Sequence, residues 1–300
     1  MLSILRQQKG SVIVMTALYM TALMGFGALS VDVGTLYLNR TQLSKEADSA
    51  ALAGAADLPY DSEQAVSTAR SYASINGKQG DSVQAAVTNN NTVVAVTVTR
   101  NVPLLFAKVF SMNLSNVKVT ARAANRVITG VTGAVPLGIE KQTLIYGQTY
   151  TLKEGGGSGT TGNYDGLSLG GSGASLYLHN LTYGYSGSLQ VGQWVDTEPG
   201  NMSGPTSSGI SYRISQDPHA TYETVKTGSP RIVVVPVVET LDVEGRKPVQ
   251  IAGFAAFFIE EVGSSGNENF VKGKFLRMYS IGETSDSGTD YGLRDIRLIE

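Results

Sequence analysis

The feature that most constrains this chain is a run from Gly10 to Val31 without a charged side chain. At ~1.5 Å per residue, a helix over the most apolar part, Ser11–Leu29, matches the ~30 Å hydrocarbon layer of a bilayer. We therefore predict a transmembrane helix over residues 10–31, with the lipid bilayer as its first partner. The side chains predicted to anchor it are Ser11, Val12, Ile13, Val14, Leu18, Leu23, Phe26 and Leu29.

The charges on either side of this run predict its orientation. Arg6 and Lys9 precede it, Asp32 follows it, and the next cation is Arg40. Because positive flanks stay in the cytoplasm, residues 1–9 are expected inside and the bulk of the chain outside the cell membrane, in a single-pass protein. A secretory signal has a shorter apolar region of roughly 7–15 residues, so cleavage near Ser30 is the weaker alternative.

The helical pattern does not stop at the membrane. Residues 35–58 lack a helix breaker until Leu58-Pro59. An apolar stripe at steps of three, four and seven residues predicts a packing face, formed by Leu36, Leu43, Ala47, Ala50 and Gly54. Such small residues allow close approach either to a domain or to a like helix. A bend at Gly25, Gly27 or Gly34 is the alternative to one continuous helix.

This segment resembles a known family. The residues that carry the resemblance are Lys9-Gly10-Ser11, the apolar run, Asp32-Val33-Gly34, Tyr37, Arg40, Leu43 and the stretch from Ala47 to Ala55. Together they resemble the amino-terminal region of Tad-type (tight adherence, Flp) pilus assembly proteins, the TadE/TadG-like group. The resemblance covers about the first sixty residues, and the remainder is only loosely similar to TadG-related proteins.

The resemblance implies a membrane-anchored, pilin-like component whose partners are other pilus assembly proteins or pilins. It also implies a second processing position, after Gly10 and before Ser11. Class III pilin signals carry a glutamate five residues beyond the cut, and Met15 takes that place here. This departure disfavours a major pilin.

Residues 32–129 are predicted to form a pilin-like α+β extracytoplasmic unit. Asp61 to Gln64 form a capping box for a helix that ends at Asn76-Gly77. Strands are predicted over 82–88 and 92–100, joined by Asn89-Asn90-Asn91, and again over 116–127. A short helix is expected to begin at Pro103.

Residues 130–300 are predicted to form a glycine-rich, mainly β domain, so the fold class is α+β overall. The strongest strand candidates lie at 231–239, 249–262 and 274–282, because their apolar runs are too short to cross a bilayer as helices. His179 is expected on a strand, residues 154–162 in a linker, and residues 196–209 in a proline- and glycine-rich turn system.

The composition argues against nucleic-acid binding, catalysis and most kinds of metal site. A net charge of −2 disfavours a nucleic-acid partner, and a chain without cysteine has no thiolate nucleophile or cluster. His179 and His219 show no catalytic or metal-binding spacing, so we expect no enzyme, no cofactor and no catalytic residue. Calcium at Asp196, Glu198 and Asn201 is left open.

Two functions remain. The first is a structural component or assembly factor of a Tad/Flp-type adhesion pilus. The alternative is a membrane-tethered module that recognises a surface polymer, because aromatic side chains offer stacking platforms. Those residues are Tyr164, Tyr177, Tyr183, Tyr185 and Trp194.

Overall fold

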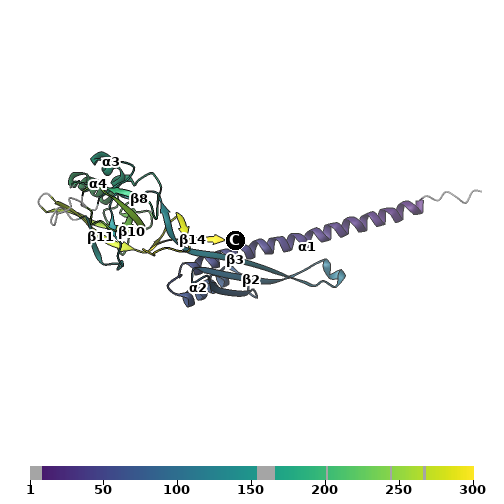
Figure 1. Ribbon diagram of the computed structural model, residues 1–300. Coiled ribbons are helices and arrows are strands. Elements are labelled where there is room, and N and C mark those ends of the chain that lie inside the picture. The colour runs from purple at the N-terminus through teal and green to yellow at the C-terminus, as the bar shows by residue number, and fades with distance from the viewer. Residues whose placement is uncertain (1–8, 154–165, 201, 244, 266–267) are drawn as a thin grey trace, which may run out of the picture. The chain divides into compact units, whose positions relative to one another are not determined.

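A computed structural model describes residues 9–153, 166–200, 202–243, 245–265 and 268–300 (Figure 1). The chain divides into two compact units, which are described separately. Unit 1 runs up to Asn125 and includes Ile296–Glu300, whereas unit 2 is Arg126–Asp295. The predicted α+β class is confirmed: a long apolar helix precedes mixed sheets and a mainly stranded carboxyl-terminal region.

Helix α1, Lys9–Ala55, is a single element of 47 residues (Figure 1). It continues without a break through Gly25, Gly27 and Gly34, so the bent alternative does not apply. From Val12 onward it is long and apolar enough to cross a membrane. It ends just before Leu58-Pro59, as the sequence predicted.

The rest of unit 1 packs a helix and a sheet against the second half of α1. Helix α2 spans Ser62–Asn76, and its cap Asp61 accepts a hydrogen bond from the Gln64 N–H at 2.8 Å. Strands β1 (Ser82–Thr88), β2 (Val93–Pro103) and β3 (Leu114–Val131) pair antiparallel in chain order. The predicted hairpin is confirmed, and so is Asp61 as the helix cap. The reciprocal half of the capping box is not formed, because the Asp61 N–H donates to the Asp57 carbonyl and the Gln64 side chain donates to Thr68 Oγ1.

The small-residue stripe of α1 lies in the core of unit 1. Leu43, Ala47 and Ala50 have no exposed surface, and Gly54 is buried as well. The side chains that cover the stripe come from α2 and β2, chiefly Ala65, Ala69, Ala73, Val94, Val96 and Val98. Of the two predicted partners, the chain's own domain is therefore the one present. The alternative partner, a like helix from another pilus protein, is thereby corrected, because these side chains are not accessible.

The connection between β2 and β3 differs from the prediction. Strand β2 continues through Pro103, which pairs with Leu114, and the expected helix shrinks to the 3-10 turn η1, Ala107–Phe110. The physical reason is that the hairpin ladder continues: the Leu104 N–H donates to the Asn113 carbonyl at 3.1 Å.

Unit 2 is built on a sheet in the order β4-β9-β10-β11-β5. Its strands are β4 (Ile139–Glu140), β5 (Thr149–Lys153), β9 (Ile232–Val238), β10 (Pro248–Ser265) and β11 (Glu268–Leu276). The shorter strands are β6 (Leu167–Ser168), β7 (Leu189–Gln190), β8 (Trp194–Thr197), β12 (Met278–Tyr279) and β13 (Glu283–Ser285). Strand β14, Leu293–Ile299, begins in unit 2 and ends in unit 1.

Two helices in unit 2 were not predicted: α3, Ala174–Tyr183, and α4, Ser203–Gln216. His179 lies on α3 rather than on a strand, and α4 replaces the second half of the predicted turn system. Helix α4 is rich in Ser and Gly, and α3 is only ten residues long, so tertiary packing rather than propensity holds them. Gly209 lies against Leu181 of α3, and Arg213 Nε donates to the Leu181 carbonyl at 2.6 Å.

The contact between α1 and α2 yields a paired test. A Cβ on Gly54 would lie 2.6 Å from the Ala65 carbonyl oxygen, whereas a Cβ on Gly34 meets nothing within 4 Å. Gly54→Ala should therefore destabilise unit 1 by roughly 1–3 kcal/mol, as overpacked cores do. Gly34→Ala, the matched control, should be neutral or stabilise the helix by up to about 1 kcal/mol. Thermal unfolding of both variants in detergent measures the difference, and equal melting temperatures would contradict the packing.

Candidate functional site

The first half of α1 presents an apolar surface that nothing in the described chain covers. Of the eight predicted anchor side chains, the seven that the structure describes are exposed, from 59% for Leu29 to 72% for Ile13. They are Val12, Ile13, Val14, Leu18, Leu23, Phe26 and Leu29. The side chains of Lys9, Gly10 and Ser11, and Arg6 as a whole, lie outside the described residues. Each Å² of such a surface favours burial by about 25 cal/mol, so lipid or protein must cover it.

Asp32, predicted as the end of the uncharged run and as a flanking charge that sets the orientation, also holds the β2–β3 hairpin. Its carboxylate is 4% exposed and accepts from the N–H groups of Leu105 (2.8 Å), Phe106 (3.0 Å) and Ala107 (2.7 Å). Burial acts to raise the pKa of Asp32, but these backbone donors and nearby Lys108 outweigh it, so the pKa lies below its usual value. The carboxylate therefore stays charged and fixes the hairpin tip to α1.

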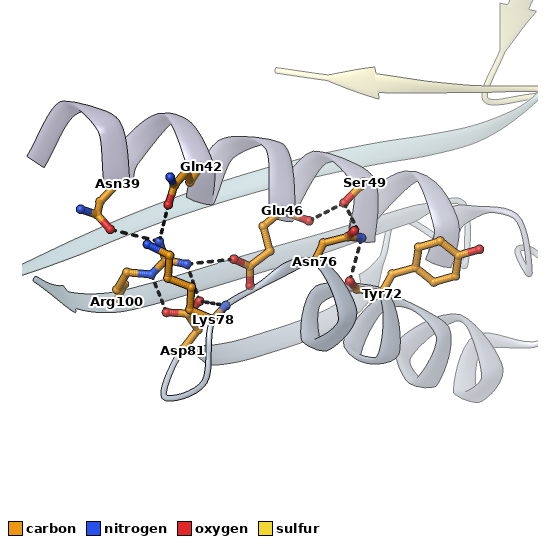
Figure 2. Close-up of polar contacts among 9 residues, drawn as sticks. All are labelled: Asn39, Gln42, Glu46, Ser49, Tyr72, Asn76, Lys78, Asp81 and Arg100. Atoms are coloured by element: carbon orange, nitrogen blue, oxygen red, sulfur yellow. Dashed lines mark hydrogen bonds and ion pairs between the residues drawn. The ribbon is translucent and has the colours of Figure 1, made fainter. Parts of the chain in front are cut away.

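A second polar contact lies further along the same helix (Figure 2). Arg100 of β2 makes a bidentate ion pair with Asp81, with Nε–Oδ1 at 2.7 Å and Nη2–Oδ2 at 2.5 Å. Its Nη1 also donates to Asn39 Oδ1 (3.1 Å) and Gln42 Oε1 (3.2 Å) on α1. Arg100 thereby ties the sheet to the helix through side chains that the sequence alone did not bring together.

Glu46 closes this polar contact on the α1 side. Its Oε2 lies 3.5 Å from Arg100 Nη2, its side chain is 2% exposed, and its Oε1 has no hydrogen-bond partner among the described residues. Burial, followed by the negative charge of Asp81, raises the pKa of Glu46 to about 6, against the opposing effect of Arg100. The arrangement therefore contains a buried carboxylate that is costly to keep charged.

A groove of about 470 Å³ follows α1 between these two contacts. Val33, Leu36, Tyr37 and Arg40 line one side, and the start of β3, residues 115–118, lines the other. Leu36, predicted to pack with the alanine stripe, is half-buried at this groove instead of in the core. Tyr37 and Leu38 beside it are 70% and 62% exposed.

Unit 2 contains a separate cavity of about 520 Å³. Tyr146, Tyr222, Arg277 and Tyr279 are among the residues that line it. The Arg277 guanidinium carbon lies 4.7 Å from the centre of the Tyr146 ring, a cation–π contact. The sequence did not predict this site, although Arg277 and Tyr279 flank one methionine in a predicted strand.

The aromatic residues predicted as stacking platforms do not form one site. Tyr177 is a core residue at 3% exposure, whereas Trp194 is 61% exposed and Tyr185 is half-buried. Tyr183, 66% exposed, lies between His179 and Tyr212, with ring centres at 5.2 and 5.8 Å. Tyr164 lies outside the described residues.

The carboxylates left open for calcium have different environments. Glu198 is 3% exposed, pairs with Arg246 at 3.2 Å and accepts from the Gly173 N–H at 3.3 Å. Asp196 is exposed, and Asn201 lies outside the described residues. His219 is exposed too, and the described part of the chain contains no group of three His, Cys, Asp or Glu side chains that fits a metal ion.

These features define a class of protein: one apolar helix long enough to span a membrane, continued as the core of an α+β unit. The comparisons agree with this description. Residues 10–57 match the family model described as "Putative Flp pilus-assembly TadE/G-like", which confirms the resemblance seen in the sequence. This chain thus carries a TadE/G-like segment that is nearly coextensive with α1. No curated protein and no solved structure gives a significant match.

The raised pKa of Glu46 predicts a pH effect on stability. The folded chain binds this proton more tightly than the unfolded chain, so this contribution is complete below about pH 4.5 and is lost as the pH rises through about 6. Glu46→Gln removes the ionisation. Its stability relative to wild type should therefore increase by about 1 kcal/mol between pH 4.5 and 7.5.

Denaturant unfolding in detergent at the two pH values measures this gain. Glu63→Gln, at an exposed position of α2, is the matched control and should show no comparable change. A constant difference between Glu46→Gln and wild type at both pH values would contradict the assignment.

Proposed function

We propose that this chain is a membrane-anchored, minor pilin-like component or assembly factor of a Tad/Flp-type adhesion pilus. The observation that carries the proposal is the continuity of α1, whose first half is uncovered and apolar and whose second half is the core of a folded unit. The family match over the same residues supports a pilus-associated role.

The proposed mechanism is physical rather than chemical. The apolar half of α1 stores the protein in the cell membrane with residues 1–9 in the cytoplasm and the bulk outside, as the flanking charges predict. If the protein leaves the bilayer, other pilus proteins must cover this surface, because exposing apolar surface to water costs about 25 cal/mol per Å². Because the alanine stripe is buried within unit 1, the contact with other pilus proteins begins instead at the exposed residues Tyr37 and Leu38.

This contact surface is testable by paired substitutions. Deletion of the gene should abolish pili, and a gene carrying Tyr37→Ser with Leu38→Ser should restore few of them while the protein still resists carbonate extraction from membranes. Ile75→Ser is the control, because Ile75 is 74% exposed on α2. Normal piliation with the double variant would exclude this face as an assembly contact.

The orientation is testable because the chain has no native cysteine. In spheroplasts, a membrane-impermeant maleimide should label Ser74→Cys, which is exposed on α2, before lysis. Ser3→Cys, in the predicted cytoplasmic flank, should react only after lysis. The reverse pattern would contradict the proposed topology.

A second function is favoured by the tyrosine- and arginine-lined cavity of unit 2, which suits a sugar or another surface polymer. In that case the full chain in detergent should sediment with isolated cell-wall sacculi, and Arg277→Ala with Tyr279→Ala should weaken the association several-fold while pili form normally. Tyr183→Ala, at another exposed tyrosine of unit 2, is the control. Equal sedimentation of all three proteins would remove this candidate.

A further inference from the structure

The tip of the β2–β3 hairpin is unusually apolar for a surface. Four large side chains are exposed there: Leu105 at 61%, Phe106 at 46%, Met112 at 55% and Leu114 at 63%. Between Pro103 and Leu114 the only charged residue is Lys108, which is exposed. Such a cluster at the end of a long hairpin indicates a surface that something else covers.

The structure fixes the level of this tip along α1. The three hydrogen bonds from Leu105, Phe106 and Ala107 to Asp32 hold it beside the residue that follows the uncharged run. The same hairpin reaches along α1 in Figure 1. If Val12–Val31 fills the ~30 Å hydrocarbon layer, the tip lies at the boundary between acyl chains and headgroups.

We propose that this hairpin tip inserts into the lipid headgroup–acyl boundary and forms a second membrane contact beside α1. The inference rests on the proposed membrane anchoring. Lipid is the occupant because the apolar tip is continuous with the apolar surface of the span and lies level with its end. A second copy of the chain is the alternative that the test must exclude.

The polar groups of the tip suit this environment. The backbone N–H groups of residues 105–107 would be costly in an apolar medium, but the Asp32 carboxylate accepts all three. The same hydrogen bonds stabilise the negative charge of the Asp32 carboxylate. Lys108 extends a cation on a flexible stem, which suits the phosphate groups of the lipid surface. With two contacts, the membrane sets both the height of unit 1 and its rotation about α1.

The experiment uses tryptophan as a depth probe in the full chain. Trp194 is the single native tryptophan, so Trp194→Phe gives a silent background. Into it are placed Phe106→Trp at the tip, Leu23→Trp near the middle of the span, and Ile75→Trp on α2 as the water-exposed control. Each protein is reconstituted at low density in phosphatidylcholine vesicles with bromine on the acyl chain, either near the headgroup or near the methyl end.

The proposal expects Phe106→Trp to emit at shorter wavelength than Ile75→Trp and to lose more emission to the shallow bromine than to the deep one. Leu23→Trp should show the opposite preference, and Ile75→Trp should lose none. A tip probe that behaves like Ile75→Trp overturns the inference and leaves the anchor intact. A blue-shifted tip probe that bromine does not quench means that protein covers it, which also overturns the inference. If Leu23→Trp is not quenched, the membrane anchor itself fails.

Discussion

The rest of the structure depends on the contact between the small-residue stripe of α1 and the elements that cover it. Ala47, Ala50 and Gly54 let α2 and β2 approach closely, and Gly54 leaves no space for even a methyl group. Because α1 is one unbroken helix, this packing couples an apolar membrane-length segment to a folded domain. A bulky residue in the stripe, such as Leu in place of the fully buried Ala50, would therefore loosen the domain from its anchor.

The polar contacts of α1 follow a regular spacing. Asp32, Asn39, Gln42 and Glu46 are separated by seven, three and four residues, which places them on one face of the helix. Asp32 receives the hairpin tip, and the other three receive Arg100. These contacts give the helix one rotational setting against the sheet, whereas the alanine packing supplies most of the apolar burial. Glu46 is the least favourable member, since it is buried and one of its oxygens has no hydrogen-bond partner in the part of the chain that the structure describes.

The sequence predicted the parts that local patterns control. The uncharged run, the helix cap at Asp61 and the asparagine turn between β1 and β2 each carry their own signal. It did not predict α3, which is short and begins at Gly173 without a side-chain cap. It did not predict α4 either, because a serine- and glycine-rich segment becomes helical only with tertiary support, here the packing of Gly209 against Leu181. For the same reason the hairpin at Pro103 appeared as a helix start, since its pairing with Leu114 is not visible in the local sequence.

The candidate sites show the same division. The anchor residues and the stripe are contiguous or periodic on one helix, so spacing revealed them. Arg100 meets Glu46 only through the fold, at a separation of 54 residues, and the cavity around Tyr146 and Arg277 unites distant segments. Whether the stripe faced the chain's own domain or a like helix was undecidable from spacing, because both require small residues.

The central claim is that α1 remains one rigid helix from the membrane into the core of unit 1. Spin labels at Val14→Cys and Arg40→Cys, both exposed and unique in a cysteine-free chain, measure this in bilayers by pulsed dipolar spectroscopy. At ~1.5 Å per residue the account predicts a narrow distance distribution near about 40 Å. A broad distribution, or one centred well below that distance, would show a hinge between membrane and domain and would contradict it.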